Sequence, residues 1–361
     1  MMFSIVLLAL AAIAAAAPQY PGLHAPASTL SKRQTTFLPS NITWSSSGIL
    51  VNPKNDSRNI AGIKDPSIIQ VDDTYHVFAS TARSEGYNLV YFNFTDFTEA
   101  NDAPFYYLDQ SGIGTGYRAA PEVFYFAPQK LWYLIYQNGN AAYSTNDDIS
   151  NPAGWTAPQT FYSDTPALIA DGLITPQQGY WVDMWVICDD ANCHLFSHDD
   201  NGRLYRSQTT LAQFPAGMSD PVIALEEPKK EDLFEASNVY SVGNGTYLLL
   251  VECIGAGDAA GGVRYFKSWT SNDIAGPWTP LATTQDHPFM GEANVEFTGT
   301  KWTKSISHGE MIRTSVDQKL GIDACGWRYL YQGVDPASTA DYNGLPWKLG
   351  LLTQKKGCSG S

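Results

Sequence analysis

The chain has 361 residues, of which 44% are hydrophobic and 16% are charged, and its formal net charge at pH 7 is -14. This acidic balance excludes nucleic acid as a partner, because the neutralisation of phosphate needs clustered Lys and Arg. It also disfavours polyanionic polysaccharides such as pectin, so a neutral substrate is expected.

The first residues of the chain have the composition of targeting and processing segments. Residues 1–17 form an apolar stretch that ends in an alanine run, which predicts a secretory signal peptide too short to span a bilayer. Residues 18–33 are rich in Pro, Ala and Ser and end in Lys32-Arg33, which predicts a pro-segment cleaved after the dibasic pair; the alternative is a plain disordered leader. We therefore expect a secreted, extracellular protein whose mature chain starts at Gln34.

Four Asn-x-Ser/Thr sequons follow the predicted signal peptide, which makes them candidate N-glycosylation sites. They lie at Asn41, Asn55, Asn93 and Asn244. The five cysteines are an odd count and too few for a disulfide scaffold, so the hydrophobic core must supply the stability. We expect either a hairpin bridge between Cys188 and Cys193 or a bridge in the C-terminal tail between Cys325 and Cys358.

Short alternating runs of apolar residues recur along residues 34–361, separated by Gly, Asn, Asp and Pro, and helical periodicity is scarce. Clear examples are 67–71, 75–79, 132–136, 184–187 and 247–251. This pattern predicts an all-β fold. No further run of the chain is apolar and long enough to predict a membrane segment.

Five of the strand-like runs begin with an acidic residue and recur at nearly regular spacing. The acids are Asp65, Glu122, Asp183, Glu235 and Glu292, and subtraction of these numbers gives separations of 57, 61, 52 and 57 residues. Repeats of this length are typical of four-stranded blades, so the sequence predicts a five-bladed β-propeller. Since no Gly/Ser-rich linker interrupts residues 34–361, they are expected to form one domain.

A second phrase supports the repeat. Residues 144–155 and 271–278 are near copies that share a Ser, Asn and Asp-rich start and a closing Gly and Trp. Trp155 and Trp278 are 123 residues apart by subtraction, which is about two blade lengths. We interpret each copy as the polar turn that ends a blade.

A propeller brings equivalent positions of successive blades to one axis, so acids that are far apart in the sequence can meet in a central pocket. The hydrolysis of a glycosidic bond needs two such groups. One protonates the leaving oxygen, and the other, on the opposite face of the sugar, activates water or attacks the anomeric carbon. The five acids exceed this requirement, and the repeat alone does not select among them.

Six phrases, in this order along the chain, resemble those of glycoside hydrolase family 62, a family of α-L-arabinofuranosidases. They are IKDP at 63–66, YRAAP at 117–121, WVDMWVICDD at 181–190, LFEASN at 233–238, YFKSWTS at 265–271 and ISHGEM at 306–311. The resemblance, to the secreted fungal type, covers essentially all of residues 34–352. It implies a single catalytic five-bladed propeller over residues 34–361 and an inverting, exo-acting enzyme that removes arabinofuranosyl side chains from arabinoxylan.

The resemblance also assigns roles to three of the acids. Asp65 resembles the general base of the family, Glu235 resembles its general acid, and Asp183 resembles the third carboxylate, which orients the acid and helps to keep it protonated. Glu122 and Glu292 stand at matching repeat positions but outside the catalytic phrases of the family. They are therefore interpreted as structural or subsite residues.

Four further residues take roles from the resemblance. Lys64 and Tyr342 are expected to bind substrate in the arabinose pocket, against the alternatives of a solvated lysine and an exposed loop tyrosine. His308 and Gln332 are expected near one structural calcium ion on the axis that is coordinated mostly by water. Histidine is an unusual ligand for this oxygen-preferring ion. No organic cofactor is expected.

Two acidic phrases invite a calcium-loop interpretation, Asp189-Asp190 and 199–202, but both lack the closing bidentate Glu of an EF-hand and lie among strands. Both are interpreted as hairpin turns.

Two other functions stay open. One is an enzyme of the related family 43, which includes xylosidases and arabinanases on a propeller with three acids. The other is a propeller that binds glycans without cleaving them, which the acids at all three catalytic positions disfavour, because binding alone needs no general acid. The expected partner is arabinoxylan or its oligosaccharides, bound by a monomer that contacts neither nucleic acid nor membrane.

Overall fold

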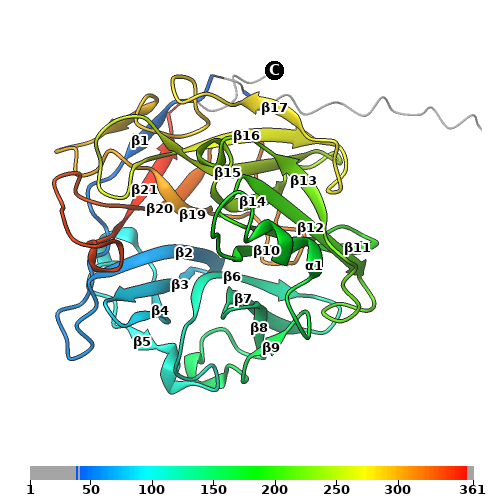
Figure 1. Ribbon diagram of the computed structural model, residues 1–361. Helices are drawn as coiled ribbons and strands as arrows, with labels where there is room; N and C mark the ends of the chain where they lie inside the picture. Colours follow the sequence, from blue (N-terminus) through cyan, green and yellow to red (C-terminus); the bar gives the residue numbers. More distant parts are fainter. Residues whose placement is uncertain (1–37, 40, 356–361) are drawn as a thin grey trace, which may run out of the picture. The chain divides into compact units, whose positions relative to one another are not determined.

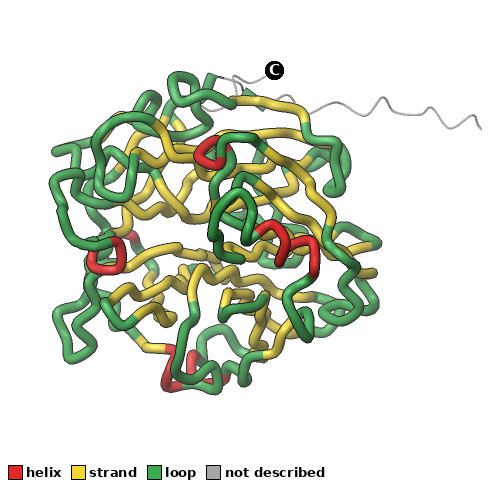
Figure 2. Tube along the Cα trace, viewed as in Figure 1, coloured by secondary structure: helices red, strands yellow, loops and turns green. Residues whose placement is uncertain are grey.

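The computed structural model describes residues 38, 39 and 41–355, all within one compact unit, Thr35–Ser361. The predicted signal peptide and pro-segment, residues 1–33, lie outside the described residues. Strands dominate the described part, as Figure 2 shows. It has one α-helix, α1 (Ala167–Gly172). Short 3-10 helices occur at Phe97–Glu99, Leu108–Gln110, Pro152–Gly154, Lys230–Asp232 and Tyr342–Gly344.

Four sheets consist of four consecutive strands each, ordered from the axis outward. The first has β2 (Gly62–Val71), β3 (Thr74–Arg83), β4 (Gly86–Phe94) and β5 (Tyr106–Tyr107). The second has β6 (Ala119–Phe126), β7 (Leu131–Gln137), β8 (Ala141–Asn146) and β9 (Gln159–Thr160). The third has β10 (Val182–Cys188), β11 (Asn192–His198), β12 (Arg203–Thr210) and β13 (Val222–Glu226). The fourth has β14 (Glu235–Ser241), β15 (Tyr247–Gly255), β16 (Val263–Ser271) and β17 (Thr279–Ala282).

The fifth sheet joins the two ends of the propeller. It contains β19 (Ser307–Met311), β20 (Arg328–Gly333), β21 (Lys348–Gln354), β1 (Trp44–Ser46) and β18 (Val295–Phe297). The strand β1 comes from the start of the described chain and pairs antiparallel with β21. Its buried Trp44 donates a hydrogen bond from Nε1 to the carbonyl of Phe289 at 2.7 Å. The N-terminal strand therefore closes the ring of blades.

The five innermost strands are β2, β6, β10, β14 and β19, and each contacts the innermost strand of the next blade, including β19 with β2. These strands lie around the centre of Figure 1. The observed architecture confirms the predicted five-bladed propeller. Most of the buried apolar side chains lie within and between the blades.

Each innermost strand carries a β-bulge near its start. In β2, Lys64 pairs with Ser80 and Ser67 pairs with Phe78, so one extra residue is inserted into β2. The other four innermost strands show the same irregularity at the matching place. In four of the blades the extra residue has a positive φ although it is not glycine: Asp65 at 48°, Ala120 at 50°, Asp183 at 56° and Ala236 at 56°.

This register corrects the predicted alignment of the acidic residues. The counterpart of Asp65 and Asp183 in the second blade is Ala120, so Glu122 lies two residues beyond that position. The buried Glu122 accepts the backbone N–H of Val186 at 2.6 Å and so links the second and third blades. This contact gives Glu122 a structural role, which is one of the two roles expected for it.

Glu292 was aligned with the wrong segment. It lies in the exposed loop between β17 and β18, where it pairs with Lys301, and the innermost strand of the fifth blade is β19. The duplicated phrases also need a correction. They form the turns between the third and fourth strands of the second and fourth blades, so each precedes the last strand of a blade. Trp155 and Trp278 anchor these turns in the core.

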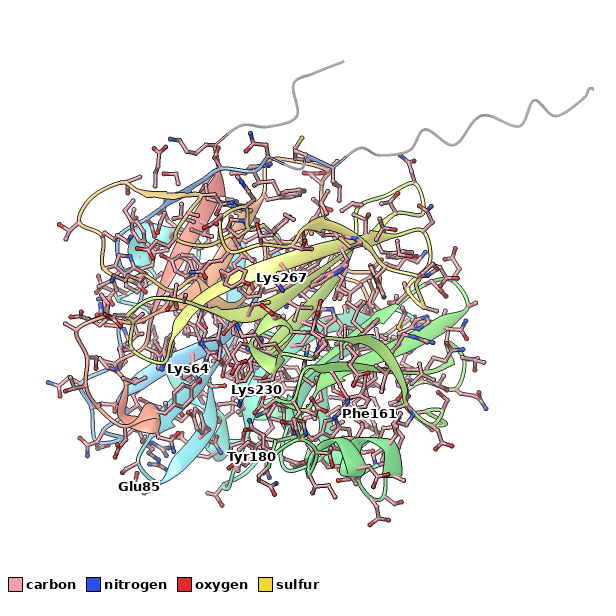
Figure 3. All side chains as sticks on the ribbon, turned by 45° about the horizontal axis from the view of Figure 1, so that its top comes forward. Lys64, Glu85, Phe161, Tyr180, Lys230 and Lys267 are labelled. Atoms are coloured by element: carbon pink, nitrogen blue, oxygen red, sulfur yellow. A yellow bond between two sulfur atoms is a disulfide. The ribbon has the colours of Figure 1, made fainter. Side chains whose placement is uncertain are left out.

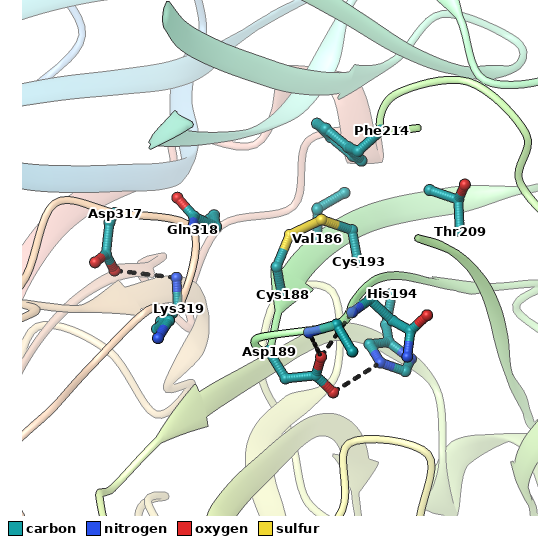
Figure 4. The surroundings of a disulfide bond; sticks show 12 residues. Val186, Cys188, Asp189, Cys193, His194, Thr209, Phe214, Asp317, Gln318 and Lys319 are labelled. Atoms are coloured by element: carbon teal, nitrogen blue, oxygen red, sulfur yellow. Dashed lines mark hydrogen bonds and ion pairs between the residues drawn. A yellow bond between two sulfur atoms is a disulfide. The ribbon is translucent and has the colours of Figure 1, made fainter. Parts of the chain in front are cut away.

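The predicted bridge between Cys188 and Cys193 is confirmed at the hairpin between β10 and β11, shown in Figure 4. The alternative bridge involves Cys358, which lies outside the described residues. The four sequon asparagines are exposed. Among the described residues, no helix is long and apolar enough to cross a membrane.

Candidate active site

A pocket of about 660 Å³ opens at the end of the axis where the innermost strands begin. Because each innermost strand starts at this end, the second strand of each blade returns to it, and the loop that follows the second strand lies there as well. Residues from these loops, such as Gly139, Asp200 and Tyr342, line the pocket together with the starts of the innermost strands. The three predicted catalytic acids and Lys64, Tyr342 and His308 all line it.

Side chains from neighbouring blades hold the bulges in place. In four of the five interfaces, a polar side chain at the end of a second strand accepts the backbone N–H of the bulged residue in the next blade. The pairs are Ser80 with Ala120 at 2.8 Å, Gln137 with Asp183 at 2.7 Å, Glu252 with His308 at 2.6 Å and Gln332 with Asp65 at 2.6 Å. These bonds fix the backbone on which the pocket acids stand.

The interface between the third and fourth blades departs from this pattern. The matching second-strand residue, His198, is fully buried, and neither of its ring nitrogens has a hydrogen-bond partner among the described residues. Burial, together with the charge of His308, lowers the pKa of His198 to about 3. The N–H of Ala236 instead donates to Asp183 Oδ2 at 2.8 Å. Asp183 is thereby held against the residue that follows Glu235.

Asp65 is buried between two cations. Its Oδ1 lies 4.0 Å from Lys64 Nζ and 3.4 Å from His308 Nδ1. Burial alone would raise the pKa of the carboxyl group, but the charge of Lys64 and the contact with His308 outweigh burial and hold the pKa well below its usual value. Asp65 is therefore ionised at any working pH of the protein.

Asp183 has the opposite electrostatic balance. Burial raises its pKa to about 7, the charge of His308 partly offsets this rise, and the neighbouring Glu235 and Asp65 add to it. His308 Nδ1 lies 3.8 Å from Asp183 Oδ2. Burial lowers the pKa of His308, but Asp183 and Asp65 outweigh it and raise the pKa to about 9, so the ring is a cation between two acids.

Glu235 stands at the first residue of β14 with its side chain 20% exposed to the pocket. Its Oε1 lies 2.8 Å from Nη1 of Arg264, and the same Nη1 lies 2.9 Å from Oε1 of the buried Glu252. A proton on Glu235 must therefore reside on Oε2, because Oε1 accepts the hydrogen bond of the guanidinium.

Lys64 is buried, so the alternative of a solvated lysine is wrong for this chain. Its ammonium group donates to the hydroxyl of Tyr342 at 3.3 Å and lies over the rings of Tyr87, Tyr342 and Trp347, 4.7 to 5.6 Å from their centroids. Tyr342 is 41% exposed, but its hydroxyl faces Lys64 in the pocket. Both residues are thus placed where a bound sugar could contact them.

The donor set around His308 does not form a calcium site by itself. Gln332 Oε1 accepts the N–H of Asp65, its amide nitrogen donates to Ser307, and His308 Nδ1 contacts Asp65 Oδ1 at 3.4 Å. Calcium prefers six to eight oxygen ligands. No group of three or more His, Cys, Asp and Glu side chains suited to a metal ion occurs among residues 38, 39 and 41–355.

The rim of the pocket is aromatic. Lys64 from β2 and Tyr180 from the loop before β10, both labelled in Figure 3, line the same pocket, and Tyr180 is 66% exposed. Tyr87 and Tyr117 line it as well, with their rings perpendicular at a centroid distance of 6.0 Å. Exposed aromatic faces beside a polar pocket suit the flat apolar faces of sugar rings.

Several residues of the site were missed by the sequence analysis. Glu252 was missed although it is a charged residue within an otherwise apolar strand, a pattern that signals a buried partner. Its partner Arg264 was missed as well, because β16 also carries Lys267 and several hydroxyl residues and so gives no comparable signal. Asp200 was interpreted only as part of a hairpin turn, yet it lines the pocket. Its phrase contains only turn residues, so the sequence holds no signal for the pocket.

Comparison with known proteins places this site in a family. Residues 43–353 match the model of glycosyl hydrolase family 62. The α-L-arabinofuranosidase C of Cellvibrio japonicus (strain Ueda107) is 44% identical over 328 residues, which are 90% of this chain and 49% of that protein. The chain therefore spans about half the length of this relative.

Solved structures agree with this match. The catalytic domain of the Coprinopsis cinerea family 62 α-L-arabinofuranosidase is 62% identical, with a TM-score of 0.86 over 90% of this chain and 100% of that one. A family 62 hydrolase in complex with xylotriose is 61% identical, with a TM-score of 0.82 over 87% of this chain and 98% of that one. A thermostable family 43 glycoside hydrolase is 14% identical with a TM-score of 0.54, which shows a shared fold alone.

Proposed function

The chain belongs to glycosyl hydrolase family 62, and from this premise we propose that it is an inverting, exo-acting α-L-arabinofuranosidase that removes arabinofuranosyl side chains from arabinoxylan. The observation that carries the proposal is the convergence of Asp65, Asp183 and Glu235 on one axial pocket with an aromatic rim. Relatives of this chain carry the same activity in their names, and one related hydrolase was solved with xylotriose. The family match favours this function over a family 43 activity.

In the proposed reaction, Glu235 donates a proton to the glycosidic oxygen through Oε2 while Asp65 takes a proton from the attacking water. The electrostatics support this division of labour. Lys64 and His308 keep Asp65 ionised, as a base must be before the reaction. When Asp65 takes up the proton, it loses the charge stabilisation from both cations, so it returns the proton to solvent readily.

Asp183 is proposed to act on the acid through position and charge. Its Oδ2 holds the N–H of Ala236, which fixes the backbone next to Glu235 at the start of β14. Arg264, shared with Glu252, holds Glu235 Oε1 and leaves Oε2 for the proton. Two fixed contacts therefore orient one acid toward the leaving oxygen.

The test is the incubation of the protein with wheat arabinoxylan and the analysis of the products. Release of free arabinose, whose first-formed anomer by proton NMR is inverted, supports the proposal. Release of xylose instead of arabinose, or hydrolysis of arabinan in a parallel incubation, would favour a family 43 activity. Binding of the polysaccharide without any release of sugar would favour the glycan-binding propeller and refute the proposed enzyme.

We further propose that the protein is a secreted, glycosylated monomer. The apolar stretch at residues 1–17 and the exposure of Asn41, Asn55, Asn93 and Asn244 support this proposal. Digestion of the secreted protein with an N-glycosidase should lower its apparent mass. The calcium prediction has a separate test, which is the activity and melting temperature after treatment with a chelator and after return of calcium. Because the donor set described above is incomplete, we expect neither quantity to change greatly.

A further inference from the structure

A fourth carboxyl group enters the pocket from the turn between β11 and β12. The strand β11 ends at His198, which pairs with Val182 at the start of β10, so the following turn lies at the pocket end of the third blade. Asp200 is in this turn, and it lines the same pocket as Asp183 and Glu235. Neither the mechanism above nor the sequence motifs use this residue.

The residues on either side of Asp200 hold the turn rigidly. Asp199 is fully buried and accepts hydrogen bonds from the N–H of Asn201 at 2.8 Å and from the hydroxyl of Tyr205 at 2.9 Å. Asn201 is buried as well, and its amide group donates to the carbonyls of Gly172 and Gln177. The side chains of Asp199 and Asn201 therefore hold the turn in its conformation, and the turn does not need the side chain of Asp200.

Asp200 itself has three features of a ligand-binding group. Its Oδ1 is buried and has no hydrogen-bond partner among the described residues. Its backbone has φ of 55°, a conformation in which glycine would be less strained. It faces two other acids across a pocket whose proposed ligand is rich in hydroxyl groups. A buried polar atom without a partner is costly unless a ligand or water satisfies it.

We propose that Asp200 is a further substrate-binding residue, a neutral carboxylic acid that donates a hydrogen bond to a hydroxyl group of the bound sugar. This inference rests on the proposed function. Burial and the charges of Glu235 and Asp183 raise the pKa of Asp200, and Arg264 offsets only part of that rise, which agrees with a protonated group. Its hydroxyl can then serve the sugar without a third negative charge in the pocket.

The test compares three single variants by kcat/KM on arabinoxylan and by melting temperature. Asp200→Gly removes the carboxyl group and suits the positive φ, so it should fold normally and lose roughly tenfold to a hundredfold in kcat/KM. Asp200→Asn keeps the size and a donor, so it should stay within roughly threefold of the wild type. The matched control is Asp72→Gly, because Asp72 has φ of 51° in the exposed turn at the other end of β2. This control should keep full activity.

An Asp200→Gly variant as active as the wild type would overturn the inference. An Asp200→Asn variant as impaired as Asp200→Gly would also overturn it, because that result would mean that Asp200 acts as an ionised carboxylate and not as a neutral donor. Failure of the proposed function is a separate result, in which the wild type releases no arabinose. In that case the same variants are compared by calorimetric binding of arabinoxylo-oligosaccharides. Weaker binding by Asp200→Gly alone would support the inference, and equal binding would overturn it.

Discussion

Replacement of Glu235 by Gln removes the proposed acid while it preserves the size of the side chain and an oxygen that can face Arg264. The structure predicts that folding survives this change. Arg264 keeps its second partner, Glu252, at 2.9 Å, so no buried cation is left alone. Because the amide oxygen of the variant can still accept a hydrogen bond from Arg264, the cost in stability should be smaller than the roughly 3 to 5 kcal/mol of a fully broken buried ion pair.

The effect on catalysis should be much larger. Removal of a general acid costs roughly a hundredfold to ten-thousandfold in rate, or about 3 to 5 kcal/mol of barrier. That cost depends on the leaving group. The xylose oxygen of arabinoxylan leaves poorly without a proton, whereas the phenolate of 4-nitrophenyl α-L-arabinofuranoside leaves well without one. The loss in the Glu235→Gln variant should therefore be at least tenfold smaller on the aryl substrate.

The assay measures kcat/KM on both substrates for the wild type, Glu235→Gln and Asp65→Asn, with the melting temperature of each as the control for folding. Asp65→Asn should lose activity equally on both substrates, because water must be activated in either reaction. If Glu235→Gln loses the same factor on both substrates, Glu235 is not the acid. Wild-type activity on arabinoxylan in either variant would remove that residue from the catalytic pair.

Two further predictions concern pH. Asp183→Asn removes a like charge beside Glu235, so the alkaline limb of the pH-rate profile should move to lower pH. Because the pKa of Asp183 is about 7, this shift should arise only where Asp183 is ionised. An unmoved alkaline limb in an active variant would contradict this tuning role. In the folded protein the pKa of His308 is raised from its ordinary value of 6.5 to about 9. The protonated ring therefore contributes its full stabilisation of the folded state below pH 6.5, and this contribution is lost as the pH rises through 9. The melting temperature of the wild type should fall across that window, and calorimetry of His308→Gln should show a flatter dependence.

The sequence by itself determined the fold class and the three acids. Alternation of apolar residues depends on local strand geometry, and the spacing of the blades depends on strand and turn lengths, so both are visible in one dimension. The phrases around Asp65, Asp183 and Glu235 carried the resemblance to a family, and the structure brings these residues to one pocket. The hairpin bridge between Cys188 and Cys193 is equally local.

Only the tertiary structure decided the register of the blades and the surroundings of the acids. The positive φ at Ala120 and the displaced position of Glu122 depend on a one-residue bulge, which is set by pairing with β7 and leaves no mark in the composition. The predicted position of Glu292 is wrong because a long segment, residues 283–306 with β18, separates β17 from β19, so the innermost strand of the fifth blade begins later than the repeat spacing predicts. The role of Asp200 was hidden for the same reason, since a polar turn on any blade has similar residues, and only the direction of its strands decides whether it faces the pocket or the opposite end.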